Sequence, residues 1–279
     1  MRTRSTSLSV GFLFATLLGG AVPPPPDHPR LPHTVPAGQR EILVAGHLFI
    51  PQKLLRKKRL PLLVHFHGAA WVAETAAAKD GRWAVISVET GEGADVYSRQ
   101  FSDHALFGKI LDEASRKTGI RFGPIVVSAW SAGYGAIREI LEVPADYRRV
   151  DKVLLLDGLH TDYAAGKPGP AESALDAGHL GIFLKFARDA VARRKTMVVI
   201  HSEIVPGTYA STTETADWLL ARLKLTRRPL PRPAPGPLGM REMSEVRAGK
   251  FRVMGYAGQT AEDHVAQFES LPWQLRLLW

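Results

Sequence analysis

The 279-residue sequence contains no cysteine. This absence excludes disulfide bonds and a lipid attached to an N-terminal cysteine. A protein of this size without disulfides depends on its hydrophobic core for stability. With 45% apolar residues, the chain has the composition to build one.

The sequence also lacks an apolar run of the ~20 residues that a membrane-spanning helix needs. The most apolar stretch is LSVGFLFATLLGGAV, which follows Arg2 and Arg4. It contains the small residues Gly19 and Ala21 and is followed directly by PPPP. Residues 1–21 are therefore predicted to be a secretory signal peptide cleaved after Ala21, with an uncleaved anchor as the alternative. We expect a periplasmic or extracellular protein with no stable membrane insertion once the signal is removed.

Signatures of nucleic-acid-binding modules are missing as well. The formal net charge is +9, but the basic residues are scattered in short groups, and the only dense run is LLRKKRL at Leu54–Leu60. Scattered charges are typical of solvated faces and loop ends. We therefore expect no nucleic-acid partner, and a protein that binds an anionic polymer of the cell envelope is a third alternative.

From residue 39 onward, strand-like and helix-like segments alternate. Apolar, β-branched runs predict strands within residues 41–50, 60–68, 83–90, 124–130, 152–158, 196–202 and 250–258. Helices are predicted at 101–118, 132–142, 180–193, 212–225 and from 262 onward. This alternation predicts an α/β fold, a mostly parallel doubly wound sheet with helices on both faces, in a single domain over residues 39–279.

Two proline-rich stretches are expected to lack regular structure. Residues 22–38 are predicted to be a disordered tail. The stretch RRPLPRPAPGPLG, Arg227–Gly239, is predicted to be an irregular surface loop before the last strand, because proline removes backbone donors.

The segment VVSAWSAG, residues 126–133, runs from a strand into a helix through a turn of small residues. A serine at such a corner has a strained backbone that exposes its hydroxyl at the carboxyl end of the sheet. Ala129 stands where the motif G-x-S-x-G has its first glycine, but it is small enough for strand and helix to approach. Ser131 is the candidate nucleophile, and a serine that only begins a helix is the alternative.

Two further segments fit the same chemistry. The strand in LPLLVHFHGAAW ends at His67-Gly68, where a loop can offer N–H groups to an oxyanion. In VMGYAGQTAEDHVAQF, His264 follows the last strand, where a general base can reach back over Ser131.

On the motifs AWSAG, HFHG and EDH, the chain resembles the α/β-hydrolase superfamily over roughly Glu41–Trp279. The resemblance implies Ser131 as the nucleophile and His264 as the base. It also implies that the N–H groups of Ala132 and Ala69 stabilise the oxyanion, with Ala70 as an alternative to Ala69.

The acid of the triad must lie between Ser131 and His264 and at the carboxyl end of a strand. Asp157 ends the strand that follows the nucleophile helix, where some lipases of the superfamily carry their acid. Glu203 follows the next strand, the family's usual position, and Asp162 lies further along the loop after Asp157. Asp157 is the first choice, and Glu203 and Asp162 are the alternatives.

Trp130, Trp71 and His67 are candidates for the substrate pocket. The segment from Asp162 to Gly181 is short and polar, which argues against a large apolar lid. His65 and His67 have the H-x-H spacing of some metal sites, but alanines follow them, so we expect no metal and no cofactor.

Together these features predict an exported serine hydrolase that cleaves a small-molecule or carbohydrate-linked ester by Ser-His-acid acyl transfer. An amidase or peptidase using the same groups is one alternative. A non-catalytic binding protein of the same fold is another, because a fold does not guarantee a reaction.

Overall fold

The computed structural model describes residues 28–164 and 175–279. The predicted signal peptide, residues 22–27 of the predicted tail, and residues 165–174 within the predicted lid segment lie outside this range. Among the helices of the described part, none is long and apolar enough to cross a bilayer.

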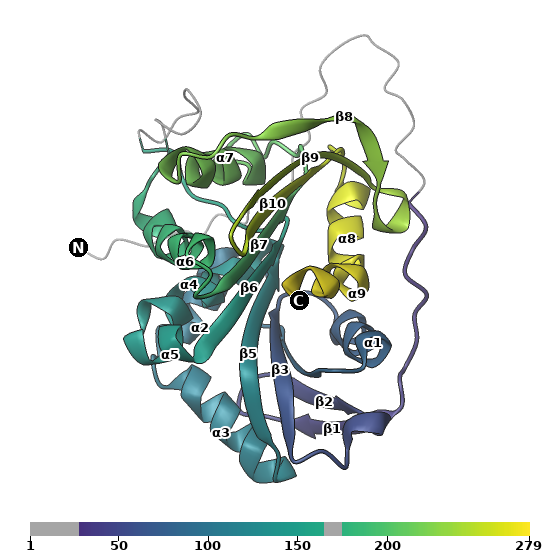
Figure 1. Ribbon diagram of the computed structural model, residues 1–279. Coiled ribbons are helices and arrows are strands. Elements are labelled where there is room, and N and C mark those ends of the chain that lie inside the picture. The colour runs from purple at the N-terminus through teal and green to yellow at the C-terminus, as the bar shows by residue number, and fades with distance from the viewer. Residues whose placement is uncertain (1–27, 165–174) are drawn as a thin grey trace, which may run out of the picture.

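A mostly parallel sheet of ten strands runs through the described residues (Figure 1). Its order is β1-β2-β4-β3-β5-β6-β7-β10-β9-β8. The strands are β1 (Gly38–Ile42), β2 (His47–Pro51), β3 (Arg59–Phe66), β4 (Ala84–Val88), β5 (Arg121–Trp130), β6 (Val150–Leu156), β7 (Thr196–His201), β8 (Arg228–Pro235), β9 (Arg241–Ala248) and β10 (Phe251–Tyr256). The strands from β4 to β10 in this order are parallel to one another, and antiparallel strands form the two edges.

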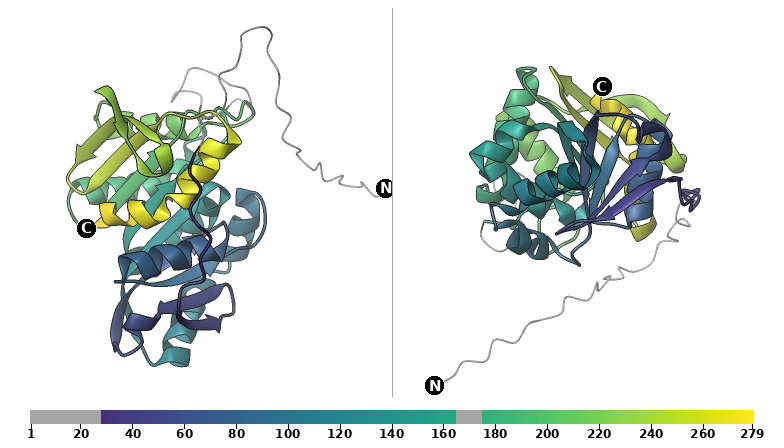
Figure 2. Two further views of the ribbon diagram at one scale, coloured as in Figure 1. Left: turned by 90° about the vertical axis from the view of Figure 1, so that its right-hand side faces the viewer. Right: turned by 90° about the horizontal axis from the view of Figure 1, so that it is seen from below.

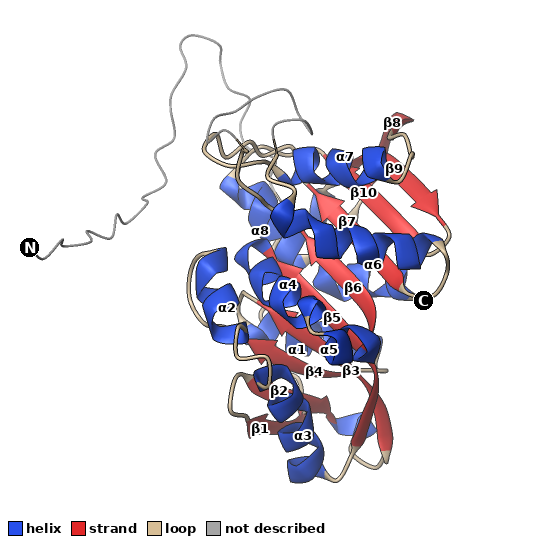
Figure 3. Cartoon of the chain, turned by 90° about the vertical axis from the view of Figure 1, so that its left-hand side faces the viewer, coloured by secondary structure: helices blue, strands red, loops and turns tan. Residues whose placement is uncertain are grey.

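Helices cover both faces of the sheet (Figures 1 and 3). One face carries α1 (Ala70–Asp80), α8 (Ala261–Glu269) and α9 (Leu271–Gln274). The other carries α2 (Ala94–Phe101), α3 (Leu106–Thr118), α4 (Tyr134–Glu142), α5 (Pro144–Arg149), α6 (Gly181–Val191) and α7 (Thr212–Arg222).

Alternate residues of the central strands face the two helical layers. On β6, Val153 and Leu155 pack toward α2–α7, whereas Leu154 and Leu156 pack toward α1, α8 and α9. Because both faces are buried, the inner part of such a strand, residues 153–156 in β6, is apolar at every position, which is the pattern read from the sequence. The predicted mostly parallel α/β sheet with helices on both faces is confirmed.

Several elements differ from the prediction. The helix predicted at 101–118 begins only at Leu106, as α3, and the preceding residues 94–101 form a separate helix, α2, that the sequence did not predict. Between the two helices, the Asp103 carboxylate accepts from the Ala105 N–H and turns the chain. No helix was predicted at α1 or α5. The first is rich in alanine, which favours helix but gives little apolar periodicity, and the second has only 6 residues.

The prediction of an irregular loop at Arg227–Gly239 is wrong. Most of it forms β8, which pairs antiparallel with β9, itself a strand that was not predicted. β8 lies at the edge of the sheet, so only one side of it needs backbone partners. Proline is tolerated in such a strand because its missing N–H need not face a neighbour.

The described part of the predicted tail, residues 28–38, is not disordered. It runs along α8 and α1, as the left view of Figure 2 shows. Leu31 is buried in the core on that face, and His28 and Arg30 bond to side chains of α8. Composition did not reveal this order because its partners are carboxylates more than two hundred residues later in the chain.

Candidate active site

Ser131 occupies the turn between β5 and α4. Its φ is 46°, in the left-handed region that residues with a side chain rarely adopt. A short 3-10 turn, Ser131–Gly133, leads from it into α4. A Cβ at Gly133 would collide with the main-chain carbonyl of Phe66 on β3, so the close approach of elbow and strand requires glycine there. The strained small-residue turn predicted from the sequence is present.

The same strain recurs on the two neighbouring strands. The residues that directly follow β3, β5 and β6 all have positive φ: His67 at 70°, Ser131 at 46° and Asp157 at 45°. Strain of this kind costs about 1–3 kcal/mol per residue and clusters at functional sites. Three candidate site residues therefore lie side by side at the carboxyl edge of the sheet.

The loop after β6 packs directly against the elbow. A Cβ at Gly158 would lie 2.6 Å from the main-chain nitrogen of Ser131, far inside van der Waals contact. Glycine at this position allows the backbone that carries Asp157 to touch the backbone that carries Ser131.

Asp157 and His264 form a hydrogen-bonded pair, with 2.7 Å between Asp157 Oδ2 and His264 Nδ1. The other carboxylate oxygen, Oδ1, accepts from the Ser202 N–H and the Thr212 hydroxyl, each at 2.8 Å. Burial alone would raise the pKa of Asp157, but the His264 ring and these donors lower it to about 2. The carboxylate is therefore ionised although it is buried.

The two alternative acids lie elsewhere. Glu203 is exposed, and its carboxylate accepts from the Gly258 N–H at 3.4 Å. Asp162 is also exposed, and its main-chain oxygen accepts from the Asp176 N–H. Within the described residues, Asp157 is the carboxylate bonded to His264, and Glu203 and Asp162 are not.

Trp130, the residue before Ser131, holds the helix that carries His264. Its indole N–H donates to the main-chain oxygen of His264 at 3.0 Å, and the two rings lie 4.7 Å apart. Phe268, one turn later on α8, stacks on the same indole at 4.9 Å. Trp130 therefore links the elbow at the end of β5 to α8 on the far side of the site.

The three residues predicted to line a substrate pocket all pack against other aromatic rings. His67 stacks on Trp130 at 5.1 Å, and its Nδ1 lies 3.0 Å from the Tyr97 hydroxyl. Trp71, in the first turn of α1, meets the ring of His33 edge-on at 4.8 Å. Trp130 and His67 thus belong to an aromatic stack beside Ser131, and a role for all three in binding substrate stays a prediction.

The candidate oxyanion donors lie where two helical segments begin. The Gly68 N–H already donates to the Glu89 carboxylate at 2.6 Å. Ala69 caps α1, and Ala132 lies in the turn that opens α4. The first N–H groups of a helix have no partner within it and mark the positive end of its dipole. Ala69 and Ala132 therefore lie at the positive ends of two helical segments, which follow the adjacent strands β3 and β5.

Two more histidines near these strands are buried or partly buried. His65 Nδ1 lies 2.7 Å from the Ser128 hydroxyl, and burial lowers the pKa of His65 to about 3. His160 Nδ1 donates to the main-chain oxygen of Ala210 at 2.9 Å, and burial lowers its pKa too. No three His, Asp or Glu side chains in the described part of the chain are grouped as metal ligands would be.

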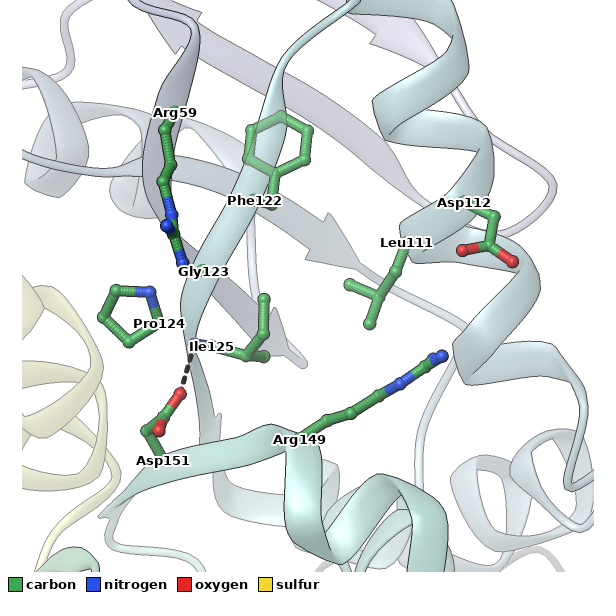
Figure 4. A pocket seen from close by; sticks show the side chains of 9 residues that line it. All are labelled: Arg59, Leu111, Asp112, Phe122, Gly123, Pro124, Ile125, Arg149 and Asp151. Atoms are coloured by element: carbon green, nitrogen blue, oxygen red, sulfur yellow. Dashed lines mark hydrogen bonds between the residues drawn. The ribbon is translucent and has the colours of Figure 1, made fainter.

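A hollow of about 520 Å³ lies at the opposite end of the sheet, where β3, β5 and β6 begin (Figure 4). Arg59, Phe122 and Arg149 line it, and the Asp151 carboxylate there accepts from the Ile125 N–H at 2.8 Å. The hollow is separate from the residues around Ser131.

The strand order, the elbow and the order Ser131, Asp157, His264 along the chain are those of the α/β-hydrolase fold. No protein-family model and no curated protein sequence matches the chain. Similar solved structures include an esterase of Pyrobaculum calidifontis, with 14% identity, a TM-score of 0.49 and coverage of 88% of this chain and 86% of that one.

A cold-adapted esterase from an Arctic intertidal metagenomic library has 12% identity and a TM-score of 0.47, and the match covers 87% of this chain and 93% of that one. An S-formylglutathione hydrolase from Agrobacterium tumefaciens has 10% identity and a TM-score of 0.46, with coverage of 86% and 99%.

The buried His65 makes stability depend on pH. The unfolded chain binds a proton at His65 near the ordinary pKa of 6.5, whereas the folded protein does so only at about 3. The free energy of unfolding is therefore highest above pH 6.5 and falls as the pH drops, by about 2 kcal/mol between pH 6.5 and pH 5 for this one group. We expect His65→Asn to reduce the loss of stability between pH 7 and pH 5 by about that amount.

Urea unfolding of both proteins at the two pH values measures this effect. Burial also lowers the pKa of His201, to about 4. His201 therefore contributes the same pH dependence of stability in both proteins and serves as the internal reference. An equal loss of stability in wild type and variant would contradict the prediction.

Proposed function

We propose that this protein is an exported serine hydrolase that cleaves esters by acyl transfer through Ser131, His264 and Asp157. The observation that carries the proposal is the 2.7 Å bond between His264 Nδ1 and the buried Asp157 carboxylate. The backbone next to Asp157, at Gly158, touches that of Ser131, a serine with a φ of 46°. A serine nucleophile, its base and the acid that orients the base are the three parts that this chemistry needs.

The Asp157 bond decides which nitrogen of His264 acts as the base. An ionised carboxylate can only accept, so Nδ1 carries the hydrogen in this pair. Nε2 is then the nitrogen with a free lone pair, and it takes the proton from the Ser131 hydroxyl. Because Asp157 remains ionised, it stabilises the imidazolium that forms.

Ser131 Oγ then attacks the ester carbonyl carbon, and the carbonyl oxygen becomes an oxyanion. The N–H groups of Ala132 and Ala69 stabilise this charge, with Ala70 as the alternative to Ala69. The Gly68 N–H takes no part because it donates to Glu89. Donors held in place by folded backbone lower the barrier by a few kcal/mol, since they need no reorganisation when the charge develops.

Collapse of this intermediate breaks the bond to the leaving oxygen, which takes the proton from His264. Water, deprotonated by the same base, then attacks the acyl-enzyme and releases the acid. An ester is the preferred substrate because its carbonyl is more electrophilic than that of an amide, and because an alkoxide is a weaker base than an amide anion. The aromatic stack beside Ser131, to which His67 belongs, suits a small-molecule or carbohydrate-linked ester.

The nucleophile is tested by labelling the wild-type protein with a fluorophosphonate probe. We expect Ser131→Ala to abolish labelling and to reduce hydrolysis of p-nitrophenyl acetate by at least about 10³-fold, because the attacking oxygen is gone. Ser102→Ala is the control, since it removes an exposed hydroxyl at the end of α2. Absence of labelling in the wild type, with an active serine esterase labelled alongside, would refute the enzyme and favour a binding protein.

The acid is tested by paired amide substitutions. We expect Asp157→Asn to lower kcat by roughly 10³-fold, because an amide neither orients the His264 tautomer nor stabilises its cation. Glu203→Gln should leave kcat within about threefold, since Glu203 bonds to the Gly258 N–H instead. Steady-state rates with p-nitrophenyl acetate decide between them, and the reverse pattern would make Glu203 the acid.

Trp130 is expected to act by holding His264 rather than by binding substrate. Trp130→Phe keeps an aromatic face but loses the N–H that donates to the His264 carbonyl. We expect kcat to fall about tenfold with KM within twofold, because a displaced base is costly even when substrate binds normally.

Trp83→Phe is the matched control for this change. Trp83 is buried, and its indole nitrogen has no hydrogen-bond partner among the described residues. The kcat of the Trp83→Phe variant is expected to stay within twofold of wild type. A higher KM with an unchanged kcat in Trp130→Phe would instead make Trp130 part of the substrate pocket.

A further inference from the structure

The helix that carries His264 is bonded to a segment from the other end of the chain. Residues 28–34, here called the N-terminal arm, run across the outer side of α8 before the chain enters β1 (Figures 1 and 2). The arm and α8 are separated by more than two hundred residues in sequence.

Arg30 makes a two-pronged ion pair with Glu269 at the end of α8. The guanidinium Nε lies 3.0 Å and 2.9 Å from the two carboxylate oxygens, and Nη2 lies 2.6 Å from Oε1. The Leu31 N–H donates to the same carboxylate at 2.9 Å. Glu269 is only 3% exposed, so these donors replace the water that would otherwise solvate its carboxylate.

His28 binds the start of the same helix. Its Nε2 lies 2.7 Å from Asp263 Oδ1, and its Nδ1 lies 2.8 Å from the main-chain oxygen of Leu238. Asp263 directly precedes His264, and its other oxygen accepts from the N–H groups of Gln259 and Thr260 at the beginning of α8. His28 thus ties the capped end of α8 to the turn that joins β8 to β9.

The two anchors bracket the base. Asp263 and Glu269 face the arm, whereas His264 and Phe268, the neighbours of those carboxylates, contact Trp130 on the side of the site. The arm therefore fixes where α8 lies over the elbow, and with it the position of the His264 ring. A shift of about 1 Å in a reacting group is enough to cost roughly a hundredfold in rate.

We propose that the N-terminal arm is a positioning element of the active site, with Arg30 and His28 holding α8 so that His264 stays aligned between Asp157 and Ser131. This inference rests on the proposed hydrolase function. It extends that function to residues that touch neither the substrate nor the triad.

The chain contains a matched control for the arm. Arg40, on β1, makes the same kind of two-pronged pair with Glu74 on α1, with Nε 3.1 Å from each carboxylate oxygen. Arg40 also donates to the main-chain oxygen of Pro36, so it fastens the same stretch of chain. Its partner helix does not carry the base, so Arg40→Ala removes a comparable ion pair without releasing α8.

The test compares Arg30→Ala, Arg30→Lys and Arg40→Ala in the full-length protein, with p-nitrophenyl acetate as the substrate and Tm measured for each variant. We expect Arg30→Ala to lower kcat about tenfold with KM within twofold. Arg30→Lys should recover part of this loss, because lysine restores the positive charge but cannot make the two-pronged pair of a guanidinium. Arg40→Ala is expected to lower Tm by an amount similar to Arg30→Ala and to leave amide exchange in α8 unchanged, because its partner Glu74 lies on α1.

Amide hydrogen exchange gives a second readout that needs no turnover and also serves if a variant is too unstable for kinetics. We expect faster exchange over residues 261–269 in both Arg30 variants and not in Arg40→Ala.

The outcomes separate this inference from the proposed function. A wild type that fluorophosphonate labels, together with an Arg30→Ala variant whose kcat stays within twofold of wild type and whose α8 exchange matches Arg40→Ala, would overturn the role of the arm alone. A wild type that is neither labelled nor active would overturn the hydrolase proposal, and the positioning role with it, whatever the exchange of α8.

Discussion

The hydrogen bond between Asp157 and His264 joins two segments that lie 107 residues apart in the chain, and the site is arranged around it. A buried carboxylate is tolerated only when donors surround it, and here Ser202 and Thr212 complete the set. Those donors lie just after β7 and in the first turn of α7. The pair therefore depends on β6, β7, α7 and α8 all meeting at one edge of the sheet.

The same edge concentrates backbone strain. His67, Ser131 and Asp157 each follow a neighbouring strand with a positive φ, and the glycines at 133 and 158 let backbones approach where any side chain would collide. Strain persists only where the surrounding structure enforces it. Here the enforcement comes from the two buried faces of the parallel sheet, whose alternating residues fix the strand ends relative to one another.

The helix that carries His264 follows β10, and two contacts from other parts of the chain hold it in place. Trp130 contacts it from the side of the sheet, and the N-terminal arm contacts it from outside. Both contacts pair polar groups that burial would otherwise leave unsatisfied, and such groups are expensive in a protein interior. The arm thus couples the stability of α8 to residues that are remote from it in sequence.

Local patterns determined much of this protein. The continuous apolar runs predicted the central strands because a strand buried on both faces must be apolar throughout. The small residues around Ser131 predicted the elbow, since only they allow that turn, and the place of His264 after the last strand followed from the strand order.

Tertiary structure alone decided which carboxylate meets His264, because Asp157, Glu203 and Asp162 all follow strands and differ only in which way the folded loops carry them. It also decided that a proline-rich stretch becomes an edge strand and that residues 28–38 are ordered. In each case the partner that stabilises the segment is distant in sequence: β9 for the prolines, and the buried carboxylates of α8 for the arm. No pattern within the segment itself can reveal such a partner.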